Sequence, residues 1–227
     1  MAEIGVYRGH FAAQMLAACS SIQRYYMVDP WRHLSGWNKP ANTDDARFAN
    51  YLAESKANTE FAGDKRVILR GTTTEVLDQI SDGSLDFVYI DGDHTLRGIC
   101  IDLVKAYPKV RAGGWIGGDD FTHTVWQHGG QFEPTLVFPF AVHFAEAVGA
   151  RIFGLPHLQF LICKPSETGS GFEFVDLTES YPDTSLQGQF RLQRVLRGWI
   201  TDTFSRKILA ERLPNNVRNA IKKTQSR

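Results

Sequence analysis

The sequence predicts an α/β fold with a doubly wound, mostly parallel sheet, and two observations support this. Near the start, a short apolar strand at residues 2–6 leads through a glycine-bearing turn into a helical pattern at residues 10–19. Further on, two apolar strands at residues 87–90 and 115–116 are separated by a helical segment long enough to cross over between them. Such crossovers are typical of parallel sheets that carry helices on both faces.

The composition is that of a globular protein that can bury a full core. Apolar residues make up 43% and charged residues 22% of the 227 residues. The net charge is zero, but residues 191–227 hold ten Lys and Arg against two acidic residues, so this tail carries +8 and the body −8. Cys19, Cys100 and Cys163 are scattered in apolar runs, which favours reduced core cysteines over a disulfide framework or zinc site.

The sequence contains no recognisable membrane or export signal. Its apolar runs all fall well short of 18 residues, and the start lacks a basic region followed by an apolar stretch. We therefore expect neither a transmembrane span nor a signal peptide, and a cytoplasmic location.

The first turn has the pattern Glu3-x-Gly5-x-x-x-Gly9, and Asp29 closes the next strand at residues 25–28. Backbone N–H groups of a glycine turn that opens a helix can bind an anionic group, and an acidic residue ending the next strand can accept hydrogen bonds from ribose hydroxyls. The spacing differs from the G-x-G-x-x-G of dinucleotide folds, and the chain has no GK[ST] phosphate loop. The same glycines would also suit a plain strand–turn–helix connection.

A long polar loop at residues 31–46 follows, with Trp31, His33 and Trp37 in it. Loops of this length often act as lids, so the two tryptophans either cover a ligand or cap exposed core. A helix is expected at residues 44–60 and a strand at 67–69. The next helix begins in the run of three threonines at 72–74, where a threonine is expected to act as N-cap.

Carboxylates follow both of the central apolar strands. Asp91, Asp93 and His94 come after the first strand, and Asp119 and Asp120 come after the second. Because parallel strands place their C-terminal ends at the same edge, where ligands of open α/β sheets bind, we expect these side chains to meet there. Oxygen ligands of this kind suit magnesium, so the sequence predicts a divalent metal and acid/base site. The alternative is plain turn formation, because Asp-Gly and Gly-Gly-Asp-Asp are good turn sequences.

The remaining elements complete about seven strands. A helix at residues 136–148 is started or broken by Pro139, and two strands at 151–154 and 159–163 form an antiparallel hairpin. Composition then changes to Ser, Thr, Gly and Pro. We therefore predict one domain at residues 1–164, followed at 165–227 by a polar linker and a basic helical extension.

The predicted extension has apolar residues at helical spacing, flanked by arginines. We expect an amphipathic helix that packs on the domain or on a second subunit of a homo-oligomer. A basic helix at residues 191–213 can also lie on an anionic membrane surface. The acidic body and the lack of a recognisable nucleic-acid motif argue against nucleic-acid partners. The apolar positions are Leu192, Val195, Leu196, Trp199, Ile200, Phe204 and Ile208.

Taken together, the E-x-G-x-x-x-G…D pattern resembles the first motifs of class I S-adenosylmethionine-dependent methyltransferases, which have a seven-stranded Rossmann-like sheet. The later motifs, IDGDH and GGWIGGDD, resemble the macrocin-type O-methyltransferases that modify sugar hydroxyls. This resemblance covers residues 2–163. Members generally carry helices before the first strand, so we expect either an earlier chain start or a partner that completes the site. The resemblance implies these cofactor-binding residues: Glu3, Gly5 and Gly9 at the methionine end, Asp29 at the ribose, Thr73 at the adenine side, and Asp91.

The resemblance also implies magnesium, or another divalent cation, held by Asp91, Asp119 and Asp120, with Asp93 as general base. We place His94 in the catalytic set, where it assists the proton transfer, orients Asp93 or caps the following helix. His123 and His128 are expected as contacts of the substrate. The predicted function is therefore a magnesium-dependent O-methyltransferase that uses S-adenosylmethionine and acts on a hydroxyl of a small molecule or sugar. The alternatives are a metal-dependent hydrolase that uses the aspartates and a non-catalytic methyltransferase-like binding module.

Overall fold

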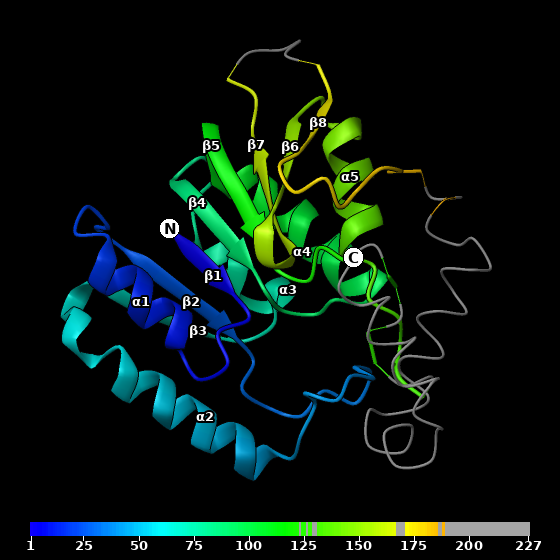
Figure 1. Cartoon of the computed structure of the whole chain (residues 1–227). Helices are drawn as coiled ribbons and strands as arrows, with labels where there is room; N and C mark the ends of the chain where they lie inside the picture. The colour runs from blue at the N-terminus through cyan, green and yellow to red at the C-terminus, as the bar shows by residue number, and fades with distance from the viewer. Residues whose placement is uncertain (123, 126, 129–130, 167–170, 186–187, 189–227) are drawn as a thin grey trace, which may run out of the picture.

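An eight-stranded sheet forms the centre of the described structure, a computed structural model that covers residues 1–122, 124–125, 127–128, 131–166, 171–185 and 188 (Figure 1). The strand order is β3-β2-β1-β4-β5-β7-β6-β8. The first five strands in this order, β3, β2, β1, β4 and β5, pair in parallel. Strand β7 is antiparallel to both β5 and β6, and β8 is parallel to β6. The strands are β1 Ala2–Ile4, β2 Tyr25–Asp29, β3 Arg66–Arg70, β4 Leu85–Ile90, β5 Val110–Gly118, β6 Arg151–Leu155, β7 Gln159–Cys163 and β8 Glu173–Asp176.

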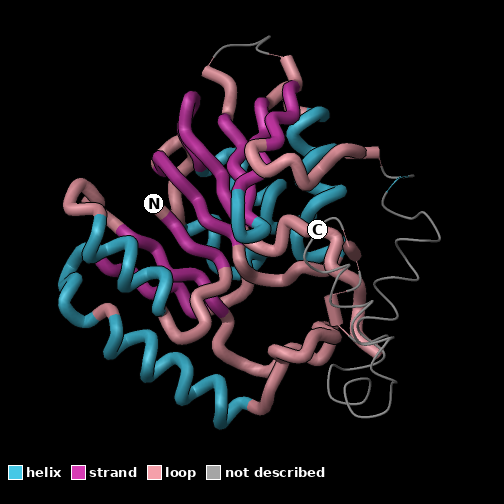
Figure 2. Tube along the Cα trace, viewed as in Figure 1, coloured by secondary structure: helices cyan, strands magenta, loops and turns pink. Residues whose placement is uncertain are grey.

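Helices cover both faces of this sheet. Helices α1 and α2 lie on one face near β1 to β3, and α4 and α5 pack together on the other face, next to the short α3 (Figures 1 and 2). None of the described helices is long and apolar enough to cross a membrane. The helices are α1 His10–Ala18, α2 Asp45–Asn58, α3 Thr73–Val76, α4 Leu96–Lys109 and α5 Val137–Ala147, with short 3-10 turns at Glu60–Lys65, Leu77–Gln79 and Pro156–Leu158.

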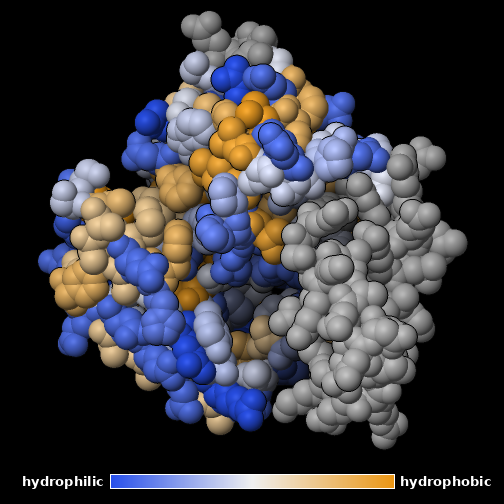
Figure 3. Space-filling view, in the orientation of Figure 1, coloured by the Kyte–Doolittle hydropathy of each residue, from blue (hydrophilic) through white to orange (hydrophobic). Residues whose placement is uncertain are grey.

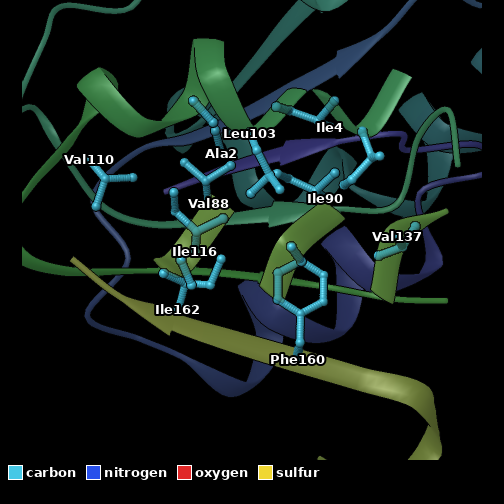
Figure 4. Packing of buried hydrophobic residues seen from close by; sticks show 14 of the residues in the cluster. Ala2, Ile4, Val88, Ile90, Leu103, Val110, Ile116, Val137, Phe160 and Ile162 are labelled. Carbon is cyan, nitrogen blue, oxygen red and sulfur yellow. The ribbon is translucent and has the colours of Figure 1, made fainter. Parts of the chain in front are cut away.

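The alternation of side chains along the strands separates two apolar cores. On β2, Tyr25 and Met27 point into the smaller core beneath α1, whereas Val28 points into the larger core beneath α4 and α5. Figure 4 shows the larger core, where Ile4, Ile90 and Leu103 meet side chains from several strands. Each fully buried side chain of this size contributes about 1.5–3 kcal/mol through removal of apolar surface from water.

The register of the central strands places their C-terminal ends level with one another. Ile4 lies opposite both Val28 and Ile90, and Ile90 lies opposite Gly118. The turns that follow β1, β2, β4 and β5 therefore emerge at the same edge of the sheet. This confirms the arrangement expected from the sequence and sets the position of the site.

The predicted fold class is confirmed, with one strand more than expected. Pro139 starts helix α5 and does not break it, since the first turn of a helix has no intrahelical partner for the N–H that proline lacks. Strand β8 extends the sheet beyond residue 164, and Tyr181 is buried with its hydroxyl donating to the carbonyl of Phe121. Part of the segment expected as a polar linker is thus structured. The division at residue 164 stays a prediction, and the helix expected at 191–213 lies outside the described residues.

Candidate functional site

A cavity of about 900 Å³ opens at the C-terminal edge of the strands, and the surface is hollowed on this side of the molecule (Figure 3). Its walls are the turns after β1 to β5 and the loop at residues 31–44, which Figure 2 shows leading from β2 to α2. This volume is at the upper end of the usual range for ligand pockets, which is about 300–1,000 Å³. Seven of the predicted site residues line the cavity: Gly5, Asp29, Thr73, Asp91, Asp93, His94 and Asp120.

The turn after β1 needs glycine at residue 5 for two reasons. Its φ is +88°, and a Cβ atom there would lie 2.0 Å from the carbonyl oxygen of Asp91. The amide of Gly5 donates to Val28, and the amide of Asp91 donates to Ile4. The first turn and the turn after β4 are therefore in direct backbone contact. Gly9, also at positive φ, is the N-cap of α1 and does not line the cavity.

Asp29 organises the first turn through hydrogen bonds to backbone amides. Its Oδ2 accepts from Val6 and Tyr7, each at 2.9 Å, and its Oδ1 accepts from Trp31 at 2.7 Å. Tyr7 and Trp31 have positive φ values of 54° and 40°, which are unfavourable for residues other than glycine unless the surroundings hold them. Burial raises the pKa of Asp29, and the three amide donors oppose this rise.

Two further residues expected at the cofactor are held by buried partners. Glu3 is absent from the lining of the cavity, and its carboxyl group accepts a hydrogen bond from the hydroxyl of Tyr25 at 2.8 Å. Burial raises the pKa of Glu3 to about 8, against the effect of Tyr25. Thr73 lines the cavity and donates to the buried carboxyl of Asp102 at 2.5 Å. The N-cap of α3 is Thr72, which forms a capping box with Glu75.

The acidic residues after β4 and β5 converge on His94. Its Nδ1 contacts Oδ2 of Asp120, and its Nε2 lies 3.2 Å from Oδ1 of Asp91 as an ion pair without hydrogen-bond geometry. Burial lowers the pKa of His94, but the two carboxylates outweigh it and raise the value to about 9. Burial raises the pKa of Asp119, and repulsion from Asp91 and Asp120 adds to this. The strand ends therefore bring together negative charges that a cation would stabilise.

The turn at residues 93–95 both orients the side chain of Asp93 and begins helix α4. The Oδ1 atom of Asp93 accepts from the amide of Thr95 at 3.0 Å, and Thr95 caps the helix by accepting from Gly98. A Cβ atom at residue 98 would lie 2.2 Å from Cγ of Asp93, so the helix start packs closely against this side chain. The N-cap of α4 is Thr95 rather than His94.

Comparison with known proteins agrees with this arrangement. The profile of a family described as "Methyltransferase domain" matches residues 2–121, which is more than half of the chain. The chain belongs to this methyltransferase family. The predicted class, an S-adenosylmethionine-dependent methyltransferase of class I, is thereby confirmed at the level of family and fold. Among curated proteins, no match was found.

Solved structures with the same fold share little sequence with this methyltransferase. A protein from Corynebacterium glutamicum aligns with a TM-score of 0.54 at 16% identity, covering 73% of this chain and 72% of its own. A putative caffeoyl-CoA O-methyltransferase from Staphylococcus aureus gives 0.51 at 12% identity, with 71% and 74% covered. The O-methyltransferase NovP gives 0.51 at 15% identity, with 73% and 71% covered. These likenesses establish the fold.

The predicted metal ligands fit a divalent cation by donor type. Asp91, Asp119 and Asp120 offer the oxygen ligands that magnesium prefers. Within the described part of the methyltransferase, however, no group of three or more His, Cys, Asp or Glu side chains is arranged to hold a metal ion. Two of the three carboxylates instead face the ring of His94. A cation bound by these residues would share the carboxylates of Asp91 and Asp120 with His94.

The loop at residues 31–44 contains residues that the sequence singled out, and one that it did not, Lys39. Trp31 is 1% exposed and belongs to the smaller core, whereas Trp37 and His33 line the cavity, so the loop both caps core and covers the cavity. Lys39 also lines the cavity, although only 6% of it is exposed. A lysine in a polar loop is normally solvated, so the sequence carried no signal for this burial. His128 lines the cavity, so its contact with a substrate stays a prediction, and His123 lies outside the described residues.

Proposed function

We propose that this methyltransferase binds S-adenosylmethionine in the cavity and transfers its methyl group to a hydroxyl oxygen of a small molecule or sugar. The observation that carries the proposal is the composition of the cavity walls. One wall contains the glycine turn and Asp29, and the adjoining wall contains Asp91, Asp93 and His94. A methyl donor held by the first wall would present its sulfonium group to the acidic side chains of the second.

The first wall offers donors and acceptors for each part of the cofactor. Helix α1 begins just after this turn, and its free N–H groups would suit the carboxylate of the methionine end, although Gly9 itself does not line the cavity. A carboxylate has about four lone-pair sites, and three of those on Asp29 are taken by backbone amides, which leaves one for a ribose hydroxyl. Thr73 lies on the adenine side. Because Glu3 is buried against Tyr25, we assign it an indirect part, supporting the turn from behind.

The second wall contributes the acid/base chemistry. The acceptor oxygen attacks the methyl carbon, the carbon–sulfur bond breaks, and the hydroxyl proton passes to Asp93 as S-adenosylhomocysteine forms. His94 follows Asp93 in the chain and stabilises the negative charges of Asp91 and Asp120. A magnesium ion bound by Asp91, Asp119 and Asp120 would lower the pKa of the acceptor hydroxyl. The cytoplasmic location and the homo-oligomeric state stay predictions from the sequence.

Calorimetric titration with S-adenosylmethionine, with and without magnesium, tests the proposal. We expect binding by the wild type, and loss of at least about tenfold in affinity in Asp29→Ala, which corresponds to about 1.4 kcal/mol. Asp78→Ala removes an exposed carboxylate that pairs with Lys105 and does not line the cavity, so this variant is the control and should bind normally. Absence of cofactor binding by the wild type would refute the proposal. If the wild type binds S-adenosylmethionine and a chelator does not change its turnover, the role of the metal is refuted and the methyltransferase function stands.

A further inference from the structure

Lys39 occupies an unusual position for a lysine. Its side chain extends from the loop at residues 31–44, which we call the covering loop, into the molecule beside the cavity. Only 6% of Lys39 is exposed. A buried ammonium group is costly unless it is paired or hydrogen-bonded. Its Nζ donates to Oγ1 of Thr135 at 2.9 Å, and burial lowers its pKa while Asp120, Asp93 and Glu133 oppose this. Lys39 is thus held near the second wall of the cavity, which we call the acidic wall and which contains Asp91, Asp93, His94 and Asp120. It makes no direct contact with the carboxylates of this wall.

The hydrogen bond to Thr135 is the first step of a chain that ends at Asp120. Thr135 donates to Oε1 of Gln127 at 2.6 Å, and Nε2 of Gln127 donates to Oδ1 of Asp120 at 2.6 Å. An ammonium group can only donate and a carboxylate can only accept, so the hydroxyl and the amide between them have fixed orientations. We call the chain Lys39–Thr135–Gln127–Asp120 the relay. Its two ends are 81 residues apart in the sequence.

Asp120 has a backbone conformation that needs such support. Its φ is +58°, which an aspartate retains only where surrounding contacts hold it. Its amide donates to Oδ1 of Asp119 at 2.8 Å, and its Oδ2 contacts His94. The relay therefore fixes one carboxylate oxygen while the other faces His94. The orientation of the Asp120 carboxylate depends on both sides.

Other contacts connect the same two loops but do not reach Asp120. The side chain of Asn38 donates to the carbonyl of Gln131 at 2.8 Å, and the amide of Glu133 donates to the carbonyl of Asn38 at 3.2 Å. Arg97 on α4 donates to the carbonyl of Gly36 at 2.8 Å. The covering loop is thus docked on residues 131–135 and on α4. Lys39 reaches Thr135 only when the loop is docked in this way.

We propose that Lys39 is a positioning residue for methyl transfer. Docking of the loop at residues 31–44 over the cavity inserts Lys39 into the relay, which turns the carboxylate of Asp120 toward His94. Closure of the cavity and alignment of the acidic wall are then one event, as in enzymes whose lids complete the catalytic arrangement. The effect on turnover rests on the proposed function, but the relay and its effect on His94 do not.

Thr135 offers a matched pair of substitutions, because valine has the shape of threonine without the hydroxyl and serine keeps the hydroxyl. Nitrogen-15 NMR of the His94 ring reports on its contact with Asp120 without any acceptor. We expect Thr135→Val and Lys39→Met to shift the His94 resonances in the same direction, and Thr135→Ser to resemble the wild type. In turnover, the first two variants should lose about tenfold in kcat with little change in KM for S-adenosylmethionine. The double variant should be no worse than either single variant, because one relay is broken once.

Asn38→Ala is the control, since it removes one contact between the loops outside the relay, while the backbone bond from Glu133 to Asn38 and the contact of Arg97 with Gly36 keep the loop docked. It should leave the His94 resonances in place. Unshifted resonances in Lys39→Met and Thr135→Val, or additive losses in the double variant, would overturn the relay. Shifted resonances with unchanged kcat would overturn the positioning role. If the wild type binds no S-adenosylmethionine but the resonances still shift, the proposed function fails and the relay stands.

Discussion

The two walls of the cavity are built in different ways. The first wall, which we call the cofactor wall because we propose that it binds the cofactor, consists of short turns around Gly5 and Asp29. Its contacts involve the backbone, and Asp29 reaches partners no more than 23 residues away in the sequence. The acidic wall is held by side chains from distant loops, and the partners Lys39 and Thr135 are 96 residues apart. The first wall is completed as soon as the parallel strands pair, whereas the second also requires two loops to dock.

This difference predicts different responses to substitution. Local opening is easiest where few buried contacts hold a segment, so loops that cover a site can open without unfolding of the sheet. Substitutions that displace the backbone of the cofactor wall should therefore unfold the protein. Damage to the acidic wall should leave the fold intact and remove activity.

The largest expected effect is that of Gly5→Ala on the cofactor wall. The new methyl group would lie 2.0 Å from the backbone oxygen of Asp91, and alanine would have to adopt a φ of +88°. Because backbone on both sides must move, we expect a loss of more than about 5 kcal/mol, which would leave little folded protein. Urea denaturation followed by circular dichroism measures this loss.

Gly83→Ala is the matched control for this substitution. Gly83 also has a positive φ, +65°, but a Cβ atom there would meet nothing within 4 Å. Only the conformational strain remains, so the variant should lose about 1–2 kcal/mol. Equal losses in the two variants would show that the contact between the two turns does not matter.

The cofactor wall was also the part most open to prediction from the sequence. The strand–turn–helix pattern placed Gly5 and Asp29 correctly at the cavity, because their positions follow from local chain geometry and strand pairing. The strand ends similarly predicted that four aspartates and His94 would meet at one edge, and all of them except Asp119 line the cavity. The relay could not be predicted, since Lys39, Gln127 and Thr135 have no common spacing and meet only through loop docking.

Glu3 shows a limit of motif reasoning within the cofactor wall. Its place in the pattern suggested a cofactor contact, but side chains alternate along β1, and Glu3 points toward Tyr25 on the neighbouring strand. Strand alternation was visible in the sequence. The burial of its partner was not, because a tyrosine in a strand is as often half exposed.

A smaller effect is expected from the ionisation of Glu3. Its pKa in the folded protein is about 8, above the ordinary 4.5, so the folded state holds this proton more tightly than the unfolded state. Its contribution to stability is therefore complete below about pH 4.5 and is lost as the pH rises to about 8, with a slope of up to about 1.4 kcal/mol per pH unit. Glu3→Gln keeps an acceptor for Tyr25 and cannot ionise. Urea denaturation between pH 5 and 8 should show a flatter dependence in this variant, and an unchanged slope would contradict the assignment.

The smallest effect on stability, and a large one on activity, is expected from Asp119→Asn. Asp119 follows β5 and adjoins the acidic wall without lining the cavity. Burial and the repulsion of Asp91 and Asp120 raise the pKa of Asp119, so its charge disfavours the folded state near neutral pH. The amide still offers an oxygen to the N–H of Asp120. Removal of the charge should leave the unfolding free energy unchanged or raise it by less than about 1 kcal/mol, since solvent screens part of the repulsion.

Asp78→Asn is the control of opposite sign, because Asp78 is paired with Lys105 and Lys109 at the surface. It should lower stability only slightly, because solvent screens an exposed ion pair, and leave methyl transfer unchanged. Asp119→Asn, in contrast, should fold normally, bind S-adenosylmethionine and lose methyl transfer. If it instead unfolds as readily as Gly5→Ala, the acidic wall is part of the structural core, and the two walls do not differ in the way their contacts suggest.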